Sequence, residues 1–269
     1  MTHDGGGPRG TLSLLEAYYD AVPRSAARTE ECGPFTLFVG TGPWPYYARP
    51  RLGAAHEFTA DDVRVARARK QALGQPESFE WVHETTPSLL DAAQEAGLEV
   101  LQAPLMVLDR AAWRAPDPPR GLSLRIFDAD DAALATGRAV QYVGFAAPGT
   151  ATGPQGRAER DAATDGGGLD FLRERLRTRV TVMAVAEGEL GPVAAGQHQP
   201  VGAVTEIVGV ATLPSVRRQG LGAAVAGALV EDALDHGAEI VFLSAGSEQI
   251  GSVYRRIGFS RVATACIVG

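Results

Sequence analysis

Residues Glu206–Gly222 read EIVGVATLPSVRRQGLG. It begins as an apolar strand, turns at Pro214 and continues into the run RRQGLG at residues 217–222, where we expect a helix to begin. The two glycines allow a tight turn and leave no side chain in front of the helix end. The first amides of a helix have no carbonyl partner, and the helix dipole makes this end positive. The stretch therefore predicts a binding site for a pyrophosphate-like group.

The same residues resemble the acetyl-CoA loop of the GNAT acetyltransferase superfamily, which has the form Arg-x-x-Gly-x-Gly between a strand and a helix. A second segment, SEQIGSVYRRIGF at residues 247–259, resembles the last helix of that family. Tyr254, Gly258 and Phe259 match its pattern, whereas Ser247 stands where Asn is usual. Both motifs occur in the expected order, which is more specific than a lone glycine loop. The resemblance covers roughly residues 120–269.

The resemblance implies an α/β fold with two GNAT-like mixed sheets flanked by helices, the C-terminal one carrying the acetyl-CoA site. It implies direct acetyl transfer from acetyl-CoA, as co-substrate, to an amine acceptor. Tyr254 would protonate the departing thiolate with a phenol of ordinary pKa, about 10, and Glu206 would take the proton of the amine. The expected cofactor contacts come from the strand, the loop and the two helices: Val210, Ala211, Thr212, Arg217, Arg218, Gln219, Gly220, Leu221, Gly222, Ala223 and Ser247.

Each candidate also has a structural interpretation. Tyr254 could be a core aromatic, Glu206 a strand-end charge that faces water, and Arg217 and Arg218 solvated surface charges. His198, on the strand next to Glu206, could assist as a base or could be a surface residue of a hairpin. His236 is expected to interact with the C-terminal end of the helix that begins at Leu221.

Composition limits the class of protein. With 269 residues and 45% hydrophobic content, the chain can fold into one large or two ordinary domains. The formal charge of -7 argues against general nucleic-acid binding and favours a cationic acceptor, either a small-molecule or a peptide amine. No apolar run reaches the roughly 18 residues of a membrane span, and no signal-peptide core is present. Two distant cysteines, Cys32 and Cys266, indicate a reducing cytoplasm, and no histidine or cysteine has the spacing of a metal ligand.

Three prolines within Ala115–Pro119 predict a linker, which divides the chain into domains 1–117 and 118–269. A further stretch, Ala147–Gly168, is expected to be a loop inside the second domain. In that domain we expect strands at 122–127, 181–186, 192–199, 204–213 and 240–243, and helices at 128–146, 169–179 and 221–236, the last ended by Gly237. The rigid aromatic segment Trp44–Tyr47 either packs the two halves together or lines an acceptor pocket.

The first half resembles a degenerate copy of the second. At an offset of 161 residues (240 minus 79), the run FEWV at 79–82 aligns with IVFL at 240–243, and residues 61–73 align with the helix at 222–234. In this alignment, TADD at 59–62 replaces the glycine loop and Ala93 replaces Tyr254. Aspartates at a helix start would repel a pyrophosphate, so we expect one cofactor site per chain. A chance match is the alternative.

The main functional alternative is an acyl-CoA sensor or interaction module that binds the cofactor without turnover. A second alternative is an enzyme that transfers an acyl group longer than acetyl. The chain could also form a homodimer. None of the residues singled out above identifies the acceptor.

Overall fold

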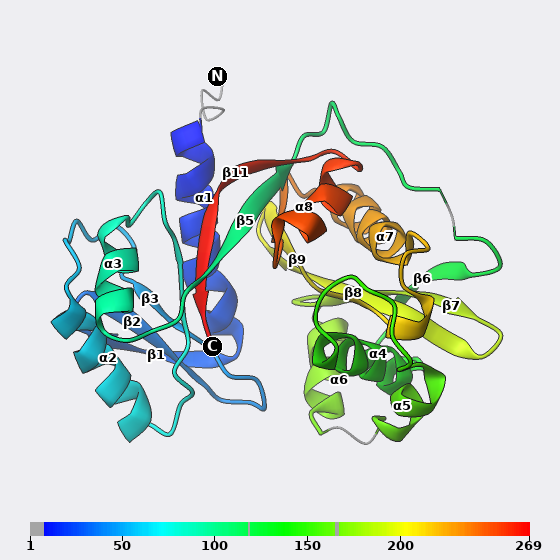
Figure 1. The fold of residues 1–269 in the computed structure, drawn as a ribbon, viewed down its shortest axis with the longest axis horizontal. Coiled ribbons are helices and arrows are strands. Elements are labelled where there is room, and N and C mark those ends of the chain that lie inside the picture. The colour runs from blue at the N-terminus through cyan, green and yellow to red at the C-terminus, as the bar shows by residue number, and fades with distance from the viewer. Residues whose placement is uncertain (1–7, 118, 165–166) are drawn as a thin grey trace. The chain divides into compact units, whose positions relative to one another are not determined.

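The structure is a computed structural model that describes residues 8–117, 119–164 and 167–269 (Figure 1). Contacts among these residues group the chain into two compact units. Unit 1 extends to Met106 and also contains Ser244–Glu248 and Arg261–Gly269, whereas unit 2 contains Val107–Leu243 and Gln249–Ser260. The predicted division into domains 1–117 and 118–269 stays a prediction. Pro118 of the predicted linker and residues 165 and 166 of the predicted loop lie outside the described residues.

Unit 2 contains a mixed sheet whose strands lie in the order β10-β9-β8-β7-β6. All neighbours are antiparallel except β10, which runs parallel to β9. The strands are β6 (Ser123–Phe127), β7 (Val182–Gly188), β8 (Gly191–Val201), β9 (Val204–Thr212) and β10 (Ile240–Ser244). The helices are α4 (Leu134–Ala146), α5 (Arg157–Ala162), α6 (Leu169–Arg177), α7 (Leu221–Asp235) and α8 (Glu248–Arg255), with the 3-10 turn η2 (Pro214–Val216) before α7. Figure 1 shows α7 on one face of these strands and α4, α5 and α6 on the other.

Helix α7 follows β9 and crosses to the parallel strand β10, which is the strand–helix–strand unit that the sequence predicts. Its apolar residues are buried against the sheet, including Leu221, Val225 and Leu229. The helix ends at Asp235, and Gly237 follows it with a φ of +84°, the left-handed conformation that glycine adopts without strain. The amides of Gly237 and Ala238 donate to carbonyls of the last helical turn, which completes the predicted C-terminal cap.

The expected helix at 128–146 begins only at Leu134. The carboxylates of Asp128 and Asp131 accept hydrogen bonds from the amides of Asp130 and Ala133, each at 2.9 Å, and these local turns compete with helix formation. Helix α5 was not predicted inside the loop at 147–168. It begins at Gly156, whose amide donates to the Glu159 carboxylate at 2.6 Å.

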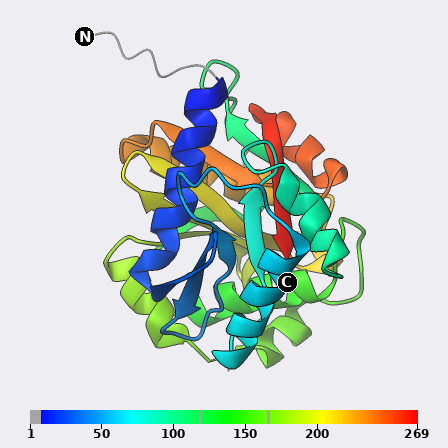
Figure 2. The same ribbon diagram turned by 90° about the vertical axis from the view of Figure 1, so that its left-hand side faces the viewer.

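Unit 1 contains strands in the order β1-β2-β3-β4-β11-β5. They are β1 (Ala27–Cys32), β2 (Phe35–Gly40), β3 (Ala48–Pro50), β4 (Phe79–Val82), β5 (Leu101–Leu108) and β11 (Phe259–Val268). The helices are α1 (Pro8–Ala21), followed by the 3-10 turn η1 (Val22–Ser25), α2 (Ala60–Ala72) and α3 (Ser88–Glu95). The view in Figure 2 brings α1, α2 and α3 to the front. The C-terminal strand β11 pairs antiparallel with β4, so the end of the chain completes the sheet of unit 1.

The two units follow the same succession of elements. In unit 1, an antiparallel hairpin (β1 and β2) precedes β3, helix α2, the parallel strand β4 and helix α3. In unit 2, the hairpin of β7 and β8 precedes β9, helix α7, the parallel strand β10 and helix α8. Phe79 begins β4 as Ile240 begins β10, which is the predicted offset of 161 residues (240 minus 79). This succession agrees with the predicted internal repeat.

The proline-rich segment that precedes β6 belongs to unit 2 and packs against helix α7 and the end of α8. We call residues 109–117, 119 and 120 the strap. Pro116 lies over helix α7 at Gly227, where an added Cβ would be 2.6 Å from the proline Cδ. Trp113 lies against Gly258, whose φ is +106° and where an added Cβ would be 2.8 Å from the tryptophan Cα. The amide of Asp109 also donates to the Gly258 carbonyl at 2.9 Å, so the strap has a defined path.

We predict that Gly227→Ala destabilises the protein. In an exposed helix the same change stabilises by about 1 kcal/mol, but here the new methyl group overlaps the Pro116 ring. Overpacking of this kind costs about 1–3 kcal/mol, so the thermal unfolding midpoint should fall. Gly222→Ala is the control, because its Cβ would be 3.9 Å from the nearest atoms and should leave the midpoint equal or higher. An increase for Gly227→Ala would show that the strap is not held at this point.

Candidate active site

Strand β9 separates from β10 in the middle of its length. The parallel register between them covers Ile240–Phe242 and ends at Glu206 on β9. Beyond Glu206, β9 continues to Thr212, and no β10 residue among those described pairs with this part. Backbone groups on an unpaired strand edge can bind an extended ligand through hydrogen bonds. Val210, Ala211 and Thr212, which are among the expected cofactor contacts, lie on this part of β9.

A β-bulge reinforces this divergence. Ala195 and Gln197 of β8 face Ala211 and Val208 of β9, so one additional residue lies on β9. Gly209 has a φ of +64°, and its carbonyl accepts a hydrogen bond of 2.8 Å from Gln141 Nε2 of α4. Gln197 Nε2 donates in turn to Gln141 Oε1 at 3.1 Å. Sequence analysis missed this support, although a glycine inside an apolar strand is a signal for a bulge.

The N-terminal end of α7 is open. Gly220 is the N-cap, with a φ of +79°, and it makes no side-chain cap hydrogen bond. The first turn of α7 contains no acidic residue, and no described residue has an atom within 4 Å of a Cβ added to Gly220. A Cβ at Gly222 would be 3.9 Å from both Thr212 and Val210, so the helix start is adjacent to the splayed part of β9. This helix end has the geometry and the polarity of an anion site.

The two neighbouring arginines have different environments. Arg217 is half-buried and donates four hydrogen bonds to backbone carbonyls: to Gly144 at 2.8 Å, Ala147 at 2.7 Å, Ala151 at 3.1 Å and Thr212 at 3.3 Å. Burial lowers the pKa of Arg217 from its usual value. Arg217 therefore fastens the end of α4 and the following loop to the end of β9.

Arg218 is exposed, and its φ of +68° is unusual for a residue other than glycine. Strained backbone of this kind is often found at functional sites. Among the described residues, no hydrogen bond or ion pair involves its side chain, in contrast to Arg217. Arg218 is therefore the better candidate of the two for contact with a phosphate.

Two cavities border this loop. One, the loop cavity, has a volume of about 540 Å³ and is lined by Gly149, Thr150, Ala151, Thr152, Arg218 and Gln249. The other, the strap cavity, has a volume of about 430 Å³ and is lined by Pro116, Asp117, Pro119, Arg120, Leu122, Gln219, Gly220, Leu221 and Ala223. Both volumes are in the range of ligand pockets in proteins.

Glu206 and His198 lie on opposite faces of the sheet. Thr205, next to Glu206 on β9, is 2.8 Å from Nδ1 of His198, whose Nε2 is 3.0 Å from Asp232 of α7. Neighbouring strand residues point to opposite faces, so Glu206 points away from α7. His198 is 1% exposed beneath that helix, whereas Glu206 is half-buried. The expectation that His198 could assist Glu206 as a base is therefore wrong. The alternative expectation, that His198 is a surface residue of a hairpin, is also wrong because His198 is buried.

Asp232 is a shared acceptor on α7. It binds His198 and the Arg179 guanidinium, the latter at 2.8 Å. Burial would raise the pKa of the Asp232 carboxyl, but the hydrogen bond from His198 and the charges of Arg179 and His236 together hold it below its usual value. His236 Nδ1 is 2.7 Å from the Asp232 carbonyl oxygen, in the last turn of α7 as predicted.

Tyr254 lies near the end of α8 and is 8% exposed. Its ring packs edge-on against Phe259, with 6.0 Å between the ring centres. Burial raises the pKa of the phenol to about 12, so the ordinary pKa assumed from the sequence is wrong. Among the described residues, none hydrogen-bonds the Tyr254 hydroxyl. Ser247 is exposed and directly precedes α8, in a segment that belongs to unit 1.

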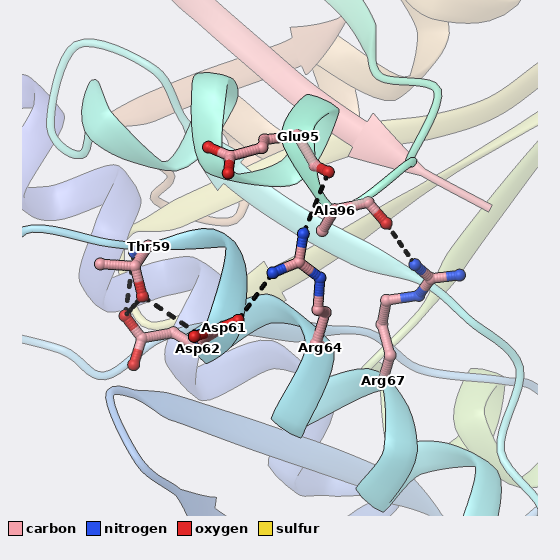
Figure 3. Close-up of polar contacts among 7 residues, drawn as sticks. All are labelled: Thr59, Asp61, Asp62, Arg64, Arg67, Glu95 and Ala96. Atoms are coloured by element: carbon pink, nitrogen blue, oxygen red, sulfur yellow. Dashed lines mark hydrogen bonds and ion pairs between the residues drawn. The ribbon is translucent and has the colours of Figure 1, made fainter.

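Helix α2, at the position of α7 in unit 1, has a closed N-terminal end (Figure 3). The Asp62 amide donates to Thr59 Oγ1 at 3.3 Å, and the Asp62 carboxylate accepts from the Thr59 amide at 2.9 Å, which forms a capping box. Asp61 pairs with Arg64 at 2.6 Å. A cavity of about 430 Å³ borders this end, and its lining residues include the acidic residues Glu57, Asp61, Asp91 and Glu95. The side chains of Thr59 and Asp62 thus cap this end of α2, whereas the start of α7 has no side-chain cap.

In residues 8–117, 119–164 and 167–269, no three histidine, cysteine or acidic side chains are grouped as a metal site would require. In the same residues, every helix is too short or too polar to cross a membrane.

Comparison with known families decides the assignment. Residues 154–259 match the model of the acetyltransferase (GNAT) family. The chain carries a GNAT acetyltransferase domain. The matched residues include β9, the loop at 217–222, α7, β10 and α8 with Tyr254. A search of curated protein sequences gives no match for this chain.

Solved structures of GNAT proteins share the fold. A GCN5-related N-acetyltransferase from Kribbella flavida is 21% identical with a TM-score of 0.70, and the match covers 96% of this chain and 95% of that one. A tandem GNAT protein from the clavulanic acid biosynthesis pathway is 13% identical with a TM-score of 0.57, covering 99% and 95%. A GCN5-related N-acetyltransferase-like protein from Streptococcus suis is 12% identical with a TM-score of 0.55, covering 97% and 99%.

We predict different effects of the same substitution at the two arginines of the GNAT loop. Arg217→Gln removes most of the hydrogen bonds to four backbone carbonyls and should destabilise the protein by on the order of 1 kcal/mol or more. The thermal unfolding midpoint should fall, and protease cleavage within residues 147–152 should become faster. Arg218→Gln makes the same change in charge and should alter neither measurement. If the two variants have the same unfolding midpoint and the same rate of protease cleavage, Arg217 does not hold this loop against β9.

Proposed function

We propose that this chain is an acetyl-CoA-dependent N-acetyltransferase with one active site, in unit 2. The observation that carries the proposal is the open N-terminal end of α7 beside the splayed part of β9, within residues that match the GNAT family. The pyrophosphate binds the first amides of α7 from Gly220 to Ala223, next to the unpaired Arg218. The backbone of Val210, Ala211 and Thr212 binds pantetheine. The side chain of Ala211 packs under α4, so this residue contributes its backbone only.

Bound acetyl-CoA supplies the acetyl group as a thioester, which a neutral amine attacks directly. Glu206 takes the proton from the amine, directly or through water, because a protonated amine has no lone pair with which to attack. Tyr254 donates its proton to the sulfur as the carbon–sulfur bond breaks, and it regains a proton from solvent afterwards. The apolar surroundings that raise the pKa of this phenol also raise that of a thiol bound there, so the donor and the acceptor stay matched.

The acceptor is an amine of a small molecule or a peptide. The net charge of -7 favours the approach of a cation, which most amines are at neutral pH. A sensor without turnover would bind acetyl-CoA and release no thiol, so thiol release over a panel of primary amines distinguishes it from an enzyme. The same assay with acyl groups of increasing length identifies the preferred donor.

Binding of the cofactor depends on the absence of a side chain at Gly220. Gly220→Asp places a carboxylate where the phosphate binds and should abolish acetyl-CoA binding in calorimetry. Gly220→Asn is the matched control, since asparagine has nearly the same shape, tolerates a positive φ and carries no charge. It should retain measurable binding. The parent should bind one acetyl-CoA per chain, because Thr59, Asp61 and Asp62 close the corresponding end in unit 1. Two sites per chain, or unchanged binding by Gly220→Asp, would contradict the proposed site.

Catalysis should depend on the Tyr254 hydroxyl. Tyr254→Phe keeps the ring that packs against Phe259 and should lower the turnover rate by roughly 10²-fold, with little change in acetyl-CoA affinity. With a pKa of about 12, the phenol stays protonated from pH 7 to pH 10. The ratio of the turnover rates of the parent and the variant should therefore be constant over this range. The measurement is thiol release with the best amine of the panel. Normal turnover of the variant would make Tyr254 a packing residue.

A further inference from the structure

The strap cavity borders the proposed pyrophosphate site at Gly220, Leu221 and Ala223, but its residues from the strap have no role in the proposed chemistry. Pro116, Pro119 and Leu122 give it apolar walls on the side of the strap and β6, and Leu221 gives one on the side of α7. Arg120 and Asp117 are its charged residues, and both are exposed. The walls suit a flat ring, and the two opposite charges suit a ligand with an anionic group and a hydrogen-bond donor.

The charge of Arg120 is not neutralised within the described part of the chain. No hydrogen bond or ion pair there involves its side chain. Other arginines of unit 2 are paired: Arg125 binds Asp131 at 2.8 Å, and Arg177 binds Asp130 at 2.8 Å. An arginine without an acidic partner, beside an open helix end, favours binding of a phosphate.

The order of groups in the cofactor assigns the two cavities. Coenzyme A is linear, with adenosine 3′-phosphate, pyrophosphate, pantetheine and sulfur in that sequence. Gln249, which lines the loop cavity, lies on α8, the helix that also carries Tyr254. Pantetheine carries the sulfur, so it must extend from the pyrophosphate toward α8 and Tyr254. It therefore lies on the side of the loop cavity. The adenosine 3′-phosphate, at the opposite end of the cofactor, then faces the strap cavity, which lies on the other side of the loop at residues 217–222.

We propose that the strap cavity binds the adenosine 3′-phosphate end of acetyl-CoA and that Arg120 is the residue that recognises the 3′-phosphate. This inference rests on the proposed function. The adenine ring lies against Pro116, Pro119 and Leu122. The Asp117 carboxylate would repel a phosphate but can accept a hydrogen bond from the amino group of adenine. The strap, near the start of unit 2, is thereby part of the cofactor site.

The packing of the strap makes this site preformed. Gly227 leaves room for Pro116 on α7, and Gly258 leaves room for Trp113 at the end of α8. Arg120 and Asp117 follow directly after this anchored part of the strap. A preformed wall reduces the entropy that binding must overcome, so the contact can add to affinity.

Calorimetry on the full chain with acetyl-CoA and with acetyl-3′-dephospho-CoA tests the assignment. The parent should bind acetyl-CoA about tenfold more tightly, the effect of one charge-assisted hydrogen bond at an exposed position. Arg120→Gln should lower the affinity for acetyl-CoA to that for the dephospho compound and leave the latter unchanged. Arg110→Gln is the matched control, because Arg110 is exposed on the same strap and lies outside the lining of the cavity. It should keep the full tenfold preference.

Each other outcome has a distinct meaning. If the parent binds both compounds equally, or if Arg120→Gln weakens both to the same extent, the assignment of Arg120 is wrong while the proposed function stands. An equal loss of preference in Arg110→Gln would show a general effect of charge and would also overturn the assignment. If the parent binds neither compound, the proposed function fails and this inference fails with it. Unchanged binding of the dephospho compound shows that the variant is folded.

Discussion

The unsatisfied amides at the start of α7 are the feature on which the other parts of the site depend. A helix end of this kind carries about half a positive charge, and proteins usually neutralise it with a side chain of the preceding loop. Here a glycine with positive φ stands at that position and contributes nothing. Unit 1 shows the usual solution on a matching framework, where Thr59 and Asp62 cap α2. The start of α2 is capped and the start of α7 can bind an anion, and this difference depends on a few residues at each helix start.

The elements around this helix end hold it open in a defined geometry. Arg217 connects the loop to the end of β9 and to the last turn of α4, while Gln141 holds the bulge on β9. The strap fits against α7 and the end of α8 through two glycines. Binding groups supplied by the backbone need such support, because their direction is set by the whole segment and not by one rotamer.

Local sequence patterns predicted the elements of unit 2 well where packing and local signals agree. Helix α7 and strand β10 begin and end close to the expected residues, because an apolar run lies between a glycine loop and a glycine cap. The predicted start of α4 was wrong because Asp128 and Asp131 bind nearby amides, a competition that periodicity does not reveal.

Within the site, the motif indicated two arginines but not their different environments. Arg217 takes part in contacts with residues about 70 positions away, which no local pattern contains. For the same reason, the burial that raises the pKa of Tyr254 could not be predicted.

The pairing of β11 with β4 has a consequence for how the chain is made. Cys266 and Val268 of this strand belong to the buried core around Trp81 and Phe79, so the sheet of unit 1 contains residues from both ends of the sequence. During synthesis β11 is made after all other strands of unit 1, and until it is available β4 has an exposed edge. Unit 1, although most of it is encoded first, therefore cannot complete its sheet before β11 has been synthesised. A chaperone that shields strand edges would act on the nascent chain until that point.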